Sequence, residues 1–216
     1  MEKILCPSMM CADFGSLKQE VQDLEAAGID MFHCDIMDGS FVPNITMGSL
    51  DVKAIRAHTR KIVDVHLMIE NPLNKVDIFI EAGADLLYIH PESERYTLKT
   101  LDYIKAKGKI PAIALNPDTA IISCTELFSH AEYVLVMTVN PGYAGQEFIE
   151  SLQDKIDELV AIKDVYGFKI VIDGAMSPDR IADLSQRGVE GFVLGSKSMF
   201  GFGKSYSEVV KELRSL

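Results

Sequence analysis

Eight short apolar runs, rich in β-branched residues and close to evenly spaced, constrain the fold of this 216-residue chain more than any other feature. The spacing averages about 27 residues (216 divided by 8), which leaves room for a helix after each run. Most runs are too apolar for half-exposed strands, which predicts strands buried on both faces, as in a parallel sheet. The runs are 4–9, 31–37, 62–68, 86–91, 110–115, 133–139, 168–174 and 191–196.

The segments between the runs have helical periodicity. In 16–27 and 147–163 apolar residues recur every three or four positions, as in amphipathic helices packed on a sheet. Glycines such as Gly28 and Gly83 stand just before a run, where left-handed backbone can end a helix. Eight β–α units predict one α/β domain over 1–216, a (β/α)8 TIM barrel. A doubly wound open sheet is the alternative, and the count of eight favours closure.

Charge and cysteine content narrow the function classes. The net charge of −11 disfavours nucleic acid and anionic membranes as partners. None of the apolar runs approaches the ~18 residues of a membrane span, and the N-terminus does not resemble a signal peptide. The four cysteines form no CxxC pair, which favours reduced thiols. We therefore expect a cytoplasmic protein.

Polar residues at the ends of three runs predict a metal site. The active site of a (β/α)8 barrel lies at the C-terminal ends of its strands. His33 and Asp35 lie two apart and share a face of the second run, His66 is near the end of the third, and Asp173 is near the end of the seventh. Two imidazoles and two carboxylates suit zinc, iron, manganese or cobalt better than calcium or magnesium. The alternative is four separate hydrogen-bonded residues, which is costly for two buried carboxylates.

The same two aspartates predict proton transfer. Asp35 and Asp173 come from strands on different sides of the barrel mouth, so a substrate between them meets one acid on each face. A neighbouring cation would stabilise an oxyanion that develops there. This arrangement suits removal of a proton next to a carbonyl and its return to the opposite face. Met37 and Met68 follow the metal-site candidates on the same strand faces and could exclude water.

Glycines on three adjacent loops predict a phosphate site. Gly142 and Gly145 follow the sixth run, Gly174 and Ala175 the seventh, and Gly195-Ser196 the eighth. Glycines let backbone N–H groups approach an anion, and the loops after strands seven and eight usually bind phosphate in this fold. Tight turns are the alternative explanation for each pair taken alone.

Several motifs resemble one enzyme family over nearly the whole chain. The strings PSMMCADF, HCDIMDGSFVPNIT, DVHLM, MTVNPGYAGQ and VIDGA are similar to those of the ribulose-phosphate 3-epimerase family. The resemblance implies a (β/α)8 barrel that inverts C3 of a ketose phosphate, one divalent metal ion (Zn, Fe, Mn, Co or Mg) and a homo-oligomer. The metal ligands it implies are His33, Asp35, His66 and Asp173.

The resemblance also assigns roles around the substrate. Asp35 and Asp173 correspond to the acid/base pair of a 1,1-proton transfer, which passes through an enediolate stabilised by the metal. Met37, Met68 and Met137 would shield that intermediate. The residues implied to contact substrate, mainly its phosphate, are Ser8, His66, Gly142, Tyr143, Ala144, Gly145, Asp173, Gly174, Ala175, Gly195 and Ser196.

Some residues depart from the ribulose-phosphate pattern. The segments Tyr143-Ala144, His90-Pro91-Glu92 and Met10-Cys11 resemble the D-allulose-6-phosphate 3-epimerase branch. The sequence reading therefore favours conversion of D-allulose 6-phosphate to D-fructose 6-phosphate. The alternative within the family is conversion of D-ribulose 5-phosphate to D-xylulose 5-phosphate.

Two further alternatives lie outside this reaction. A barrel aldolase or decarboxylase would need a lysine at a strand end near the aspartates, and the runs lack one there. A non-catalytic sugar-phosphate-binding barrel would not need a carboxylate on each face of its ligand.

Overall fold

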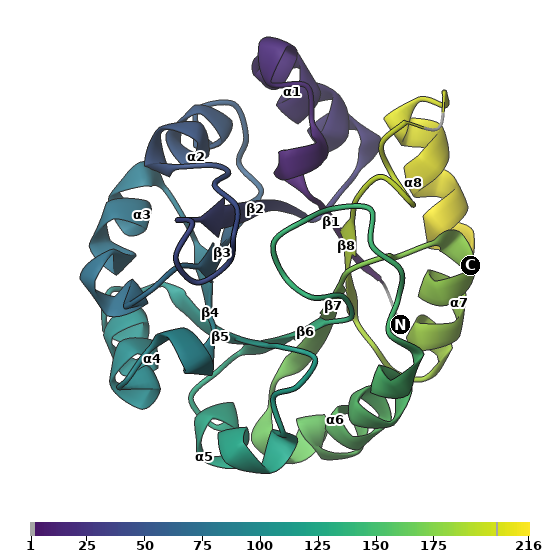
Figure 1. The fold of residues 1–216 in the computed structure, drawn as a ribbon. Helices are drawn as coiled ribbons and strands as arrows, with labels where there is room; N and C mark the ends of the chain where they lie inside the picture. Colours follow the sequence, from purple (N-terminus) through teal and green to yellow (C-terminus); the bar gives the residue numbers. More distant parts are fainter. Residues whose placement is uncertain (1–2, 202) are drawn as a thin grey trace.

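The computed structural model describes residues 3–201 and 203–216, which form the predicted (β/α)8 barrel, with eight strands inside a ring of helices (Figure 1). The strands are β1 (Ile4–Pro7), β2 (Met31–Met37), β3 (Ile62–Met68), β4 (Leu86–Ile89), β5 (Ile110–Leu115), β6 (Tyr133–Met137), β7 (Lys169–Asp173) and β8 (Gly191–Leu194). The α-helices are α1 (Leu17–Ala27), α2 (Ser49–Arg56), α3 (Val76–Ala82), α4 (Thr97–Ala106), α5 (Thr125–Phe128), α6 (Gln153–Tyr166), α7 (Pro178–Gln186) and α8 (Tyr206–Ser215).

All pairings between neighbouring strands are parallel, and β1 pairs with β8, so the first and last strands lie side by side. The join between β1 and β2 is a single bridge from Ser8 to His33. This bridge lies just past the C-terminal end of β1 and joins it to the predicted metal ligand His33 within β2. The observed closure excludes the open doubly wound sheet.

Two apolar layers form the core because successive strand residues point to opposite faces. One layer lies between the strands and helices and contains Cys34, which points away from its neighbours His33 and Asp35 as predicted. The other fills the barrel interior and contains Tyr88 and Leu135. The strands are therefore buried on both faces, which explains why most of their residues are apolar.

The largest error in the predicted elements concerns the segment 147–163. The sequence predicts one helix there, but Phe148 lies in a loop, Glu150–Leu152 is a 3-10 turn (η6), and α6 begins at Gln153. Phe148 is nonetheless buried, and the Arg180 guanidinium lies 3.9 Å from its ring centroid. A loop residue can bury the same face as the following helix, so periodicity alone misplaces the helix start.

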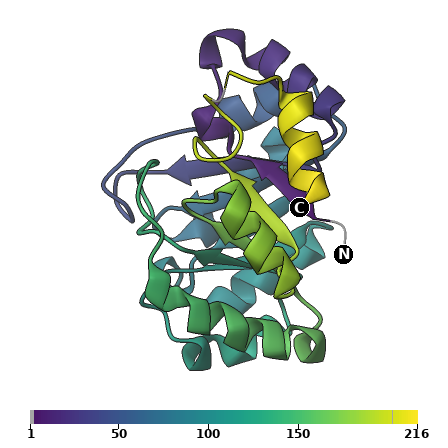
Figure 2. The same ribbon diagram turned by 90° about the vertical axis from the view of Figure 1, so that its right-hand side faces the viewer.

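Long loops extend from one end of the barrel. The segments after β2 and β6 project from the C-terminal ends of the strands on the same side of the molecule (Figure 2). They touch each other, because the Asn44 side chain donates to the Gly142 carbonyl over 2.7 Å. In the part of the chain that the structure covers, the helices are too short or too polar to cross a membrane.

Candidate active site

The four predicted metal ligands converge at the C-terminal end of the barrel. One donor atom from each of His33, Asp35, His66 and Asp173 lies within 4.8 Å of the others. The Asp35 Oδ1 atom is 3.2 Å from His33 Nε2 and 3.2 Å from His66 Nδ1. The Asp173 Oδ2 atom is 3.8 Å from the same two nitrogens. The strands β2, β3 and β7 therefore bring together residues that are far apart in the sequence.

Asp64 contacts one of these ligands, His33, and is not among the residues that the sequence predicts. Its Oδ1 lies 2.5 Å from His33 Nδ1, and both side chains are buried. Because Asp64 lies two residues before His66 on β3, it shares the inward face, and this period-two spacing could have revealed it. The contact favours a proton on Nδ1, which leaves the His33 Nε2 lone pair for a cation.

The electrostatics of the group attract positive charge. Burial lowers the pKa of His33, but the charges of Asp64 and Asp35 raise it well above its usual range. Burial, followed by the charge of Asp35, raises the pKa of Asp173 to about 7. Burial also raises the pKa of Asp35, but His33 and His66 outweigh this effect and hold it below its usual range. The two candidate acid/base groups thus have environments that separate their pKa values.

The donor chemistry fits a divalent cation. When the proton of His33 is on the nitrogen facing Asp64, the Nε2 lone pair points at an Asp35 oxygen. Two electron-rich atoms at 3.2 Å repel unless a proton or a metal ion lies near them. Two imidazole nitrogens and two carboxylate oxygens form a donor set used by zinc and by redox-active first-row metals. These four residues could hold such an ion.

A cleft that is partly open to solvent begins at this group. Asp35 and Asp173 line its floor, and the hydroxyl of Ser8 donates to Asp35 Oδ2 over 2.7 Å. His66, predicted to contact substrate, has no exposed surface and does not line the cleft. The three predicted shielding residues also line it, and all are buried: Met37, Met68 and Met137.

The predicted phosphate loops line the outer part of the cleft. Gly174 (φ 115°) and Ala175 (φ 54°) are left-handed in succession, a turn that can present backbone N–H groups to an anion. Gly174 tolerates no side chain, because an added Cβ would lie 2.9 Å from the backbone nitrogen of Val139. The other predicted substrate residues that line the cleft are Gly142, Tyr143, Ala144, Gly145, Gly195 and Ser196.

Further lining residues were not among the predicted site residues. Met10 and Cys11 follow β1, and Lys197 follows β8. The Lys197 ammonium lies 2.8 Å from Glu147, which joins the loops after β6 and β8 beside the cleft. Nothing in its flanking residues distinguishes Lys197 from an ordinary surface lysine.

Comparison with solved structures supports the fold. The 3-hexulose-6-phosphate synthase of Salmonella typhimurium superposes with a TM-score of 0.74 at 16% identity, covering 100% of this chain and 97% of that chain. The 3-keto-L-gulonate-6-phosphate decarboxylase of Vibrio cholerae gives 0.72 at 12% identity, covering 100% and 97%. Identities this low establish the barrel architecture alone.

Comparison of sequences is more specific. Residues 4–199 match the model of the ribulose-phosphate 3-epimerase family. The ribulose-phosphate 3-epimerase of Bacillus subtilis is 40% identical over 195 residues, covering 89% of this chain and 90% of the relative. The chloroplastic ribulose-5-phosphate-3-epimerase of Arabidopsis thaliana is 38% identical over 216 residues, covering 98% and 76%. The chain therefore belongs to the ribulose-phosphate 3-epimerase family, a family of carbohydrate epimerases.

Proposed function

We propose that this protein epimerises C3 of a ketose phosphate and that its substrate pair is D-ribulose 5-phosphate and D-xylulose 5-phosphate. One observation carries the reaction: Asp35 and Asp173 both line the cleft, and they lie next to two buried histidines. The relatives reported above are named for ribulose phosphate and so favour the pentulose. They give no support to D-allulose 6-phosphate, which the sequence motifs favoured.

The two aspartates carry out the proton transfer in this proposal. Their strands, β2 and β7, are separated by β1 and β8, so the carboxylates reach the substrate from different sides. One aspartate removes the C3 proton to give an enediolate, and the other delivers a proton to the opposite face. A bound divalent cation would supply positive charge that stabilises the negative oxygens.

The rest of the cleft binds and protects the substrate. Met37, Met68 and Met137 present apolar thioethers beside the reacting carbon and exclude water, which would otherwise protonate the intermediate on either face. The loops after β6, β7 and β8 would hold the phosphate through backbone N–H groups. A phosphate held at a fixed distance from the aspartates determines which carbon lies between them.

Exchange of the C3 proton in deuterated buffer tests the reaction directly. Protein loaded with Co²⁺, Mn²⁺ or Zn²⁺ is incubated with ribulose 5-phosphate or allulose 6-phosphate, beside a chelated control. We expect deuterium at C3 only with metal, and a higher kcat/KM for the pentulose. A higher value for allulose 6-phosphate would transfer the proposal to the hexulose, and no exchange by metal-loaded protein would contradict the reaction.

Replacement of either aspartate tests the two-base assignment. We expect Asp35→Asn and Asp173→Asn each to lower turnover by about 1,000-fold or more, because each removes one of two required proton carriers. Asp77→Asn is a matched control, since Asp77 lies at the surface of α3, where it accepts from the Tyr103 hydroxyl. Near-normal turnover in either active-site variant would contradict the assignment.

We also propose a homo-oligomer located in the cytoplasm. Apolar side chains are exposed on the outer helices, for example Leu50 (79%) and Val165 (81%), and contact between subunits would cover some of them. All four cysteines are unpaired, as in a reducing compartment. Light scattering during size exclusion tests the assembly, and a monomeric mass would contradict it.

A further inference from the structure

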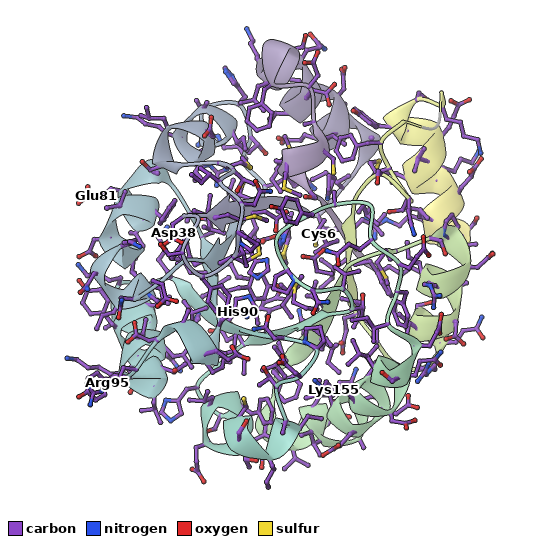
Figure 3. The ribbon with its side chains drawn as sticks, viewed as in Figure 1. Cys6, Asp38, Glu81, His90, Arg95 and Lys155 are labelled. Carbon is purple, nitrogen blue, oxygen red and sulfur yellow. The ribbon has the colours of Figure 1, made fainter. Side chains whose placement is uncertain are left out.

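His90 is a fully buried histidine immediately after β4 that the proposed reaction does not use. It lies near the barrel axis, unlike the labelled Glu81 and Arg95 on the outer surface (Figure 3). Its Nε2 atom is 2.8 Å from the Nε2 atom of His66. The two ring centroids are 5.0 Å apart, and the ring of Phe41 packs 4.9 Å away on His90.

A hydrogen bond between two imidazole nitrogens has a direction. One nitrogen carries the proton and the other accepts it. If His66 donates from Nε2, its Nδ1 lone pair faces Asp35 and Asp173, where the metal ligands converge. If His90 donates instead, neutral His66 carries its proton on Nδ1 and directs it into the donor group. Only the first arrangement allows His66 to bind a cation through Nδ1.

Glu92 favours the first arrangement. The second nitrogen of His90, Nδ1, is buried without a hydrogen-bond partner, and a Glu92 oxygen lies 3.6 Å away. A carboxylate at this position stabilises a proton on Nδ1, which leaves Nε2 of His90 as the acceptor. The Thr119 hydroxyl donates to the other oxygen of Glu92 and holds this side chain in place.

We propose that His90, oriented by Glu92, is a positioning residue that keeps the proton of His66 on Nε2 and its Nδ1 lone pair directed at the metal site. In this proposal His90 accepts the ring proton of His66, as Asp64 accepts the ring proton of His33. The acceptor is a neutral imidazole for His66 and a carboxylate for His33. The inference depends on the proposed function in one respect, because His66 must act as a metal ligand.

Cobalt binding measures this role without reference to turnover. Full-length protein is titrated with Co²⁺ and followed by its visible absorption, with a competing chelator to set the free concentration. We expect His90→Leu to weaken binding about 10- to 100-fold, because His66 then loses the acceptor that fixes its tautomer. His90→Gln places an amide oxygen near the same position and should restore most of the affinity.

Phe41→Leu provides the matched control, because it alters the packing on the His90 ring and leaves the hydrogen bond intact. We expect this variant to bind Co²⁺ as the unmodified protein does. Equal affinities for His90→Leu and the unmodified protein would overturn the inference while leaving the epimerase proposal standing. Failure of the unmodified protein to bind Co²⁺ would overturn both.

A second measurement needs no variant at His90. The ¹⁵N shifts of the Zn²⁺-loaded protein distinguish a protonated ring nitrogen from one with a free or coordinated lone pair, and His66→Asn assigns the signals. We expect the proton of His66 on Nε2. A proton on Nδ1 would overturn the inference even if His90→Leu failed to fold.

Discussion

Asp64 reaches no substrate, yet it controls which nitrogen of His33 is available to a cation. Its Oδ1 accepts from His33 Nδ1, whereas its Oδ2 is buried without a partner. We expect Asp64→Asn to weaken Co²⁺ binding about 10- to 100-fold, because the amide lacks the charge that holds the proton on Nδ1. Unchanged affinity in a competition titration would show that the orientation of His33 does not depend on this carboxylate.

Asp38 gives a pH-dependent contribution to stability. Its two oxygens accept from the N–H groups of Ser40, Phe41 and Glu70 and from the Lys75 ammonium. Burial raises the pKa of Asp38, but these hydrogen bonds lower it to about 2. Because the folded-state pKa lies below the unfolded value of about 4, the stabilisation is complete above pH 4 and is lost as the pH falls toward 2.

The variant Asp38→Asn tests this contribution to stability. We expect a free energy of unfolding about 1–2 kcal/mol lower at pH 7, since hydrogen bonds to a charged acceptor are lost. The difference from the unmodified protein should shrink between pH 4 and pH 2.5, because the unfolded chain takes up a proton at Asp38 in this range, whereas the folded chain does so only near pH 2. Urea unfolding at pH 7 and pH 3 checks this, and equal differences at both would contradict it.

At the scale of elements, an ion pair connects α6 to β7 and β8. The Lys163 ammonium on α6 contacts the Glu190 carboxylate just before β8, and both side chains are nearly buried. The other Glu190 oxygen accepts from the N–H of Ile170 on β7 over 2.9 Å. Removal of the lysine alone would leave a buried, uncompensated carboxylate.

We therefore expect Lys163→Met to lower the free energy of unfolding by about 3–5 kcal/mol. The double variant Lys163→Met with Glu190→Gln should lose much less free energy of unfolding, because it removes both charges. Urea unfolding of the two variants makes the comparison. A loss under about 1 kcal/mol for the single variant would show that water or another group compensates Glu190.

Elements were predictable to different degrees. The runs 31–37, 62–68 and 110–115 coincide with observed strands in both bounds, although the first two contain the polar residues of the site. The predicted strand 4–9 is longer than the observed one, since β1 ends at Pro7 and Met9 begins a 3-10 turn. Met9 is fully buried all the same, so burial alone does not mark the end of a strand.

For the whole molecule, we expect metal binding and the stability of the barrel to be coupled. Asp35 and Asp64 are buried and Asp173 is partly buried, and the three carboxylates lie close together. A metal ion held by this group would bind only the folded chain. At a metal concentration 1,000-fold above Kd the gain is about 4 kcal/mol. For a domain of this size that corresponds to roughly 8–16 °C in Tm.

Chelation should therefore lower the Tm measured by calorimetry, and the unmodified protein should recover when Zn²⁺ or Co²⁺ is restored. Asp173→Asn removes one ligand, so we expect its Tm to depend much less on metal. A Tm of the unmodified protein that is indifferent to both chelator and metal would contradict coupling between site and barrel.

The location of the site was predictable because all strands of a (β/α)8 barrel point the same way. The shared strand direction predicts that the C-terminal ends of β2, β3 and β7 lie at the same end of the barrel. The support for His33 and His66 by Asp64 and His90 was not foreseen. The His66–His90 contact depends on side-chain rotamers that are chosen only when β3 and β4 pack together, so its direction is absent from the sequence pattern.

The distribution of the donor group along the chain also imposes an order on biosynthesis. His33, Asp35 and His66 leave the ribosome early, whereas Asp173 and the β8 strand that closes against β1 follow much later. A partly translated chain therefore carries three potential ligands without the barrel that holds them in place. A metal ion held by all four groups would have to wait until translation has passed β7, so we expect loading to be a late event in the life of each new chain.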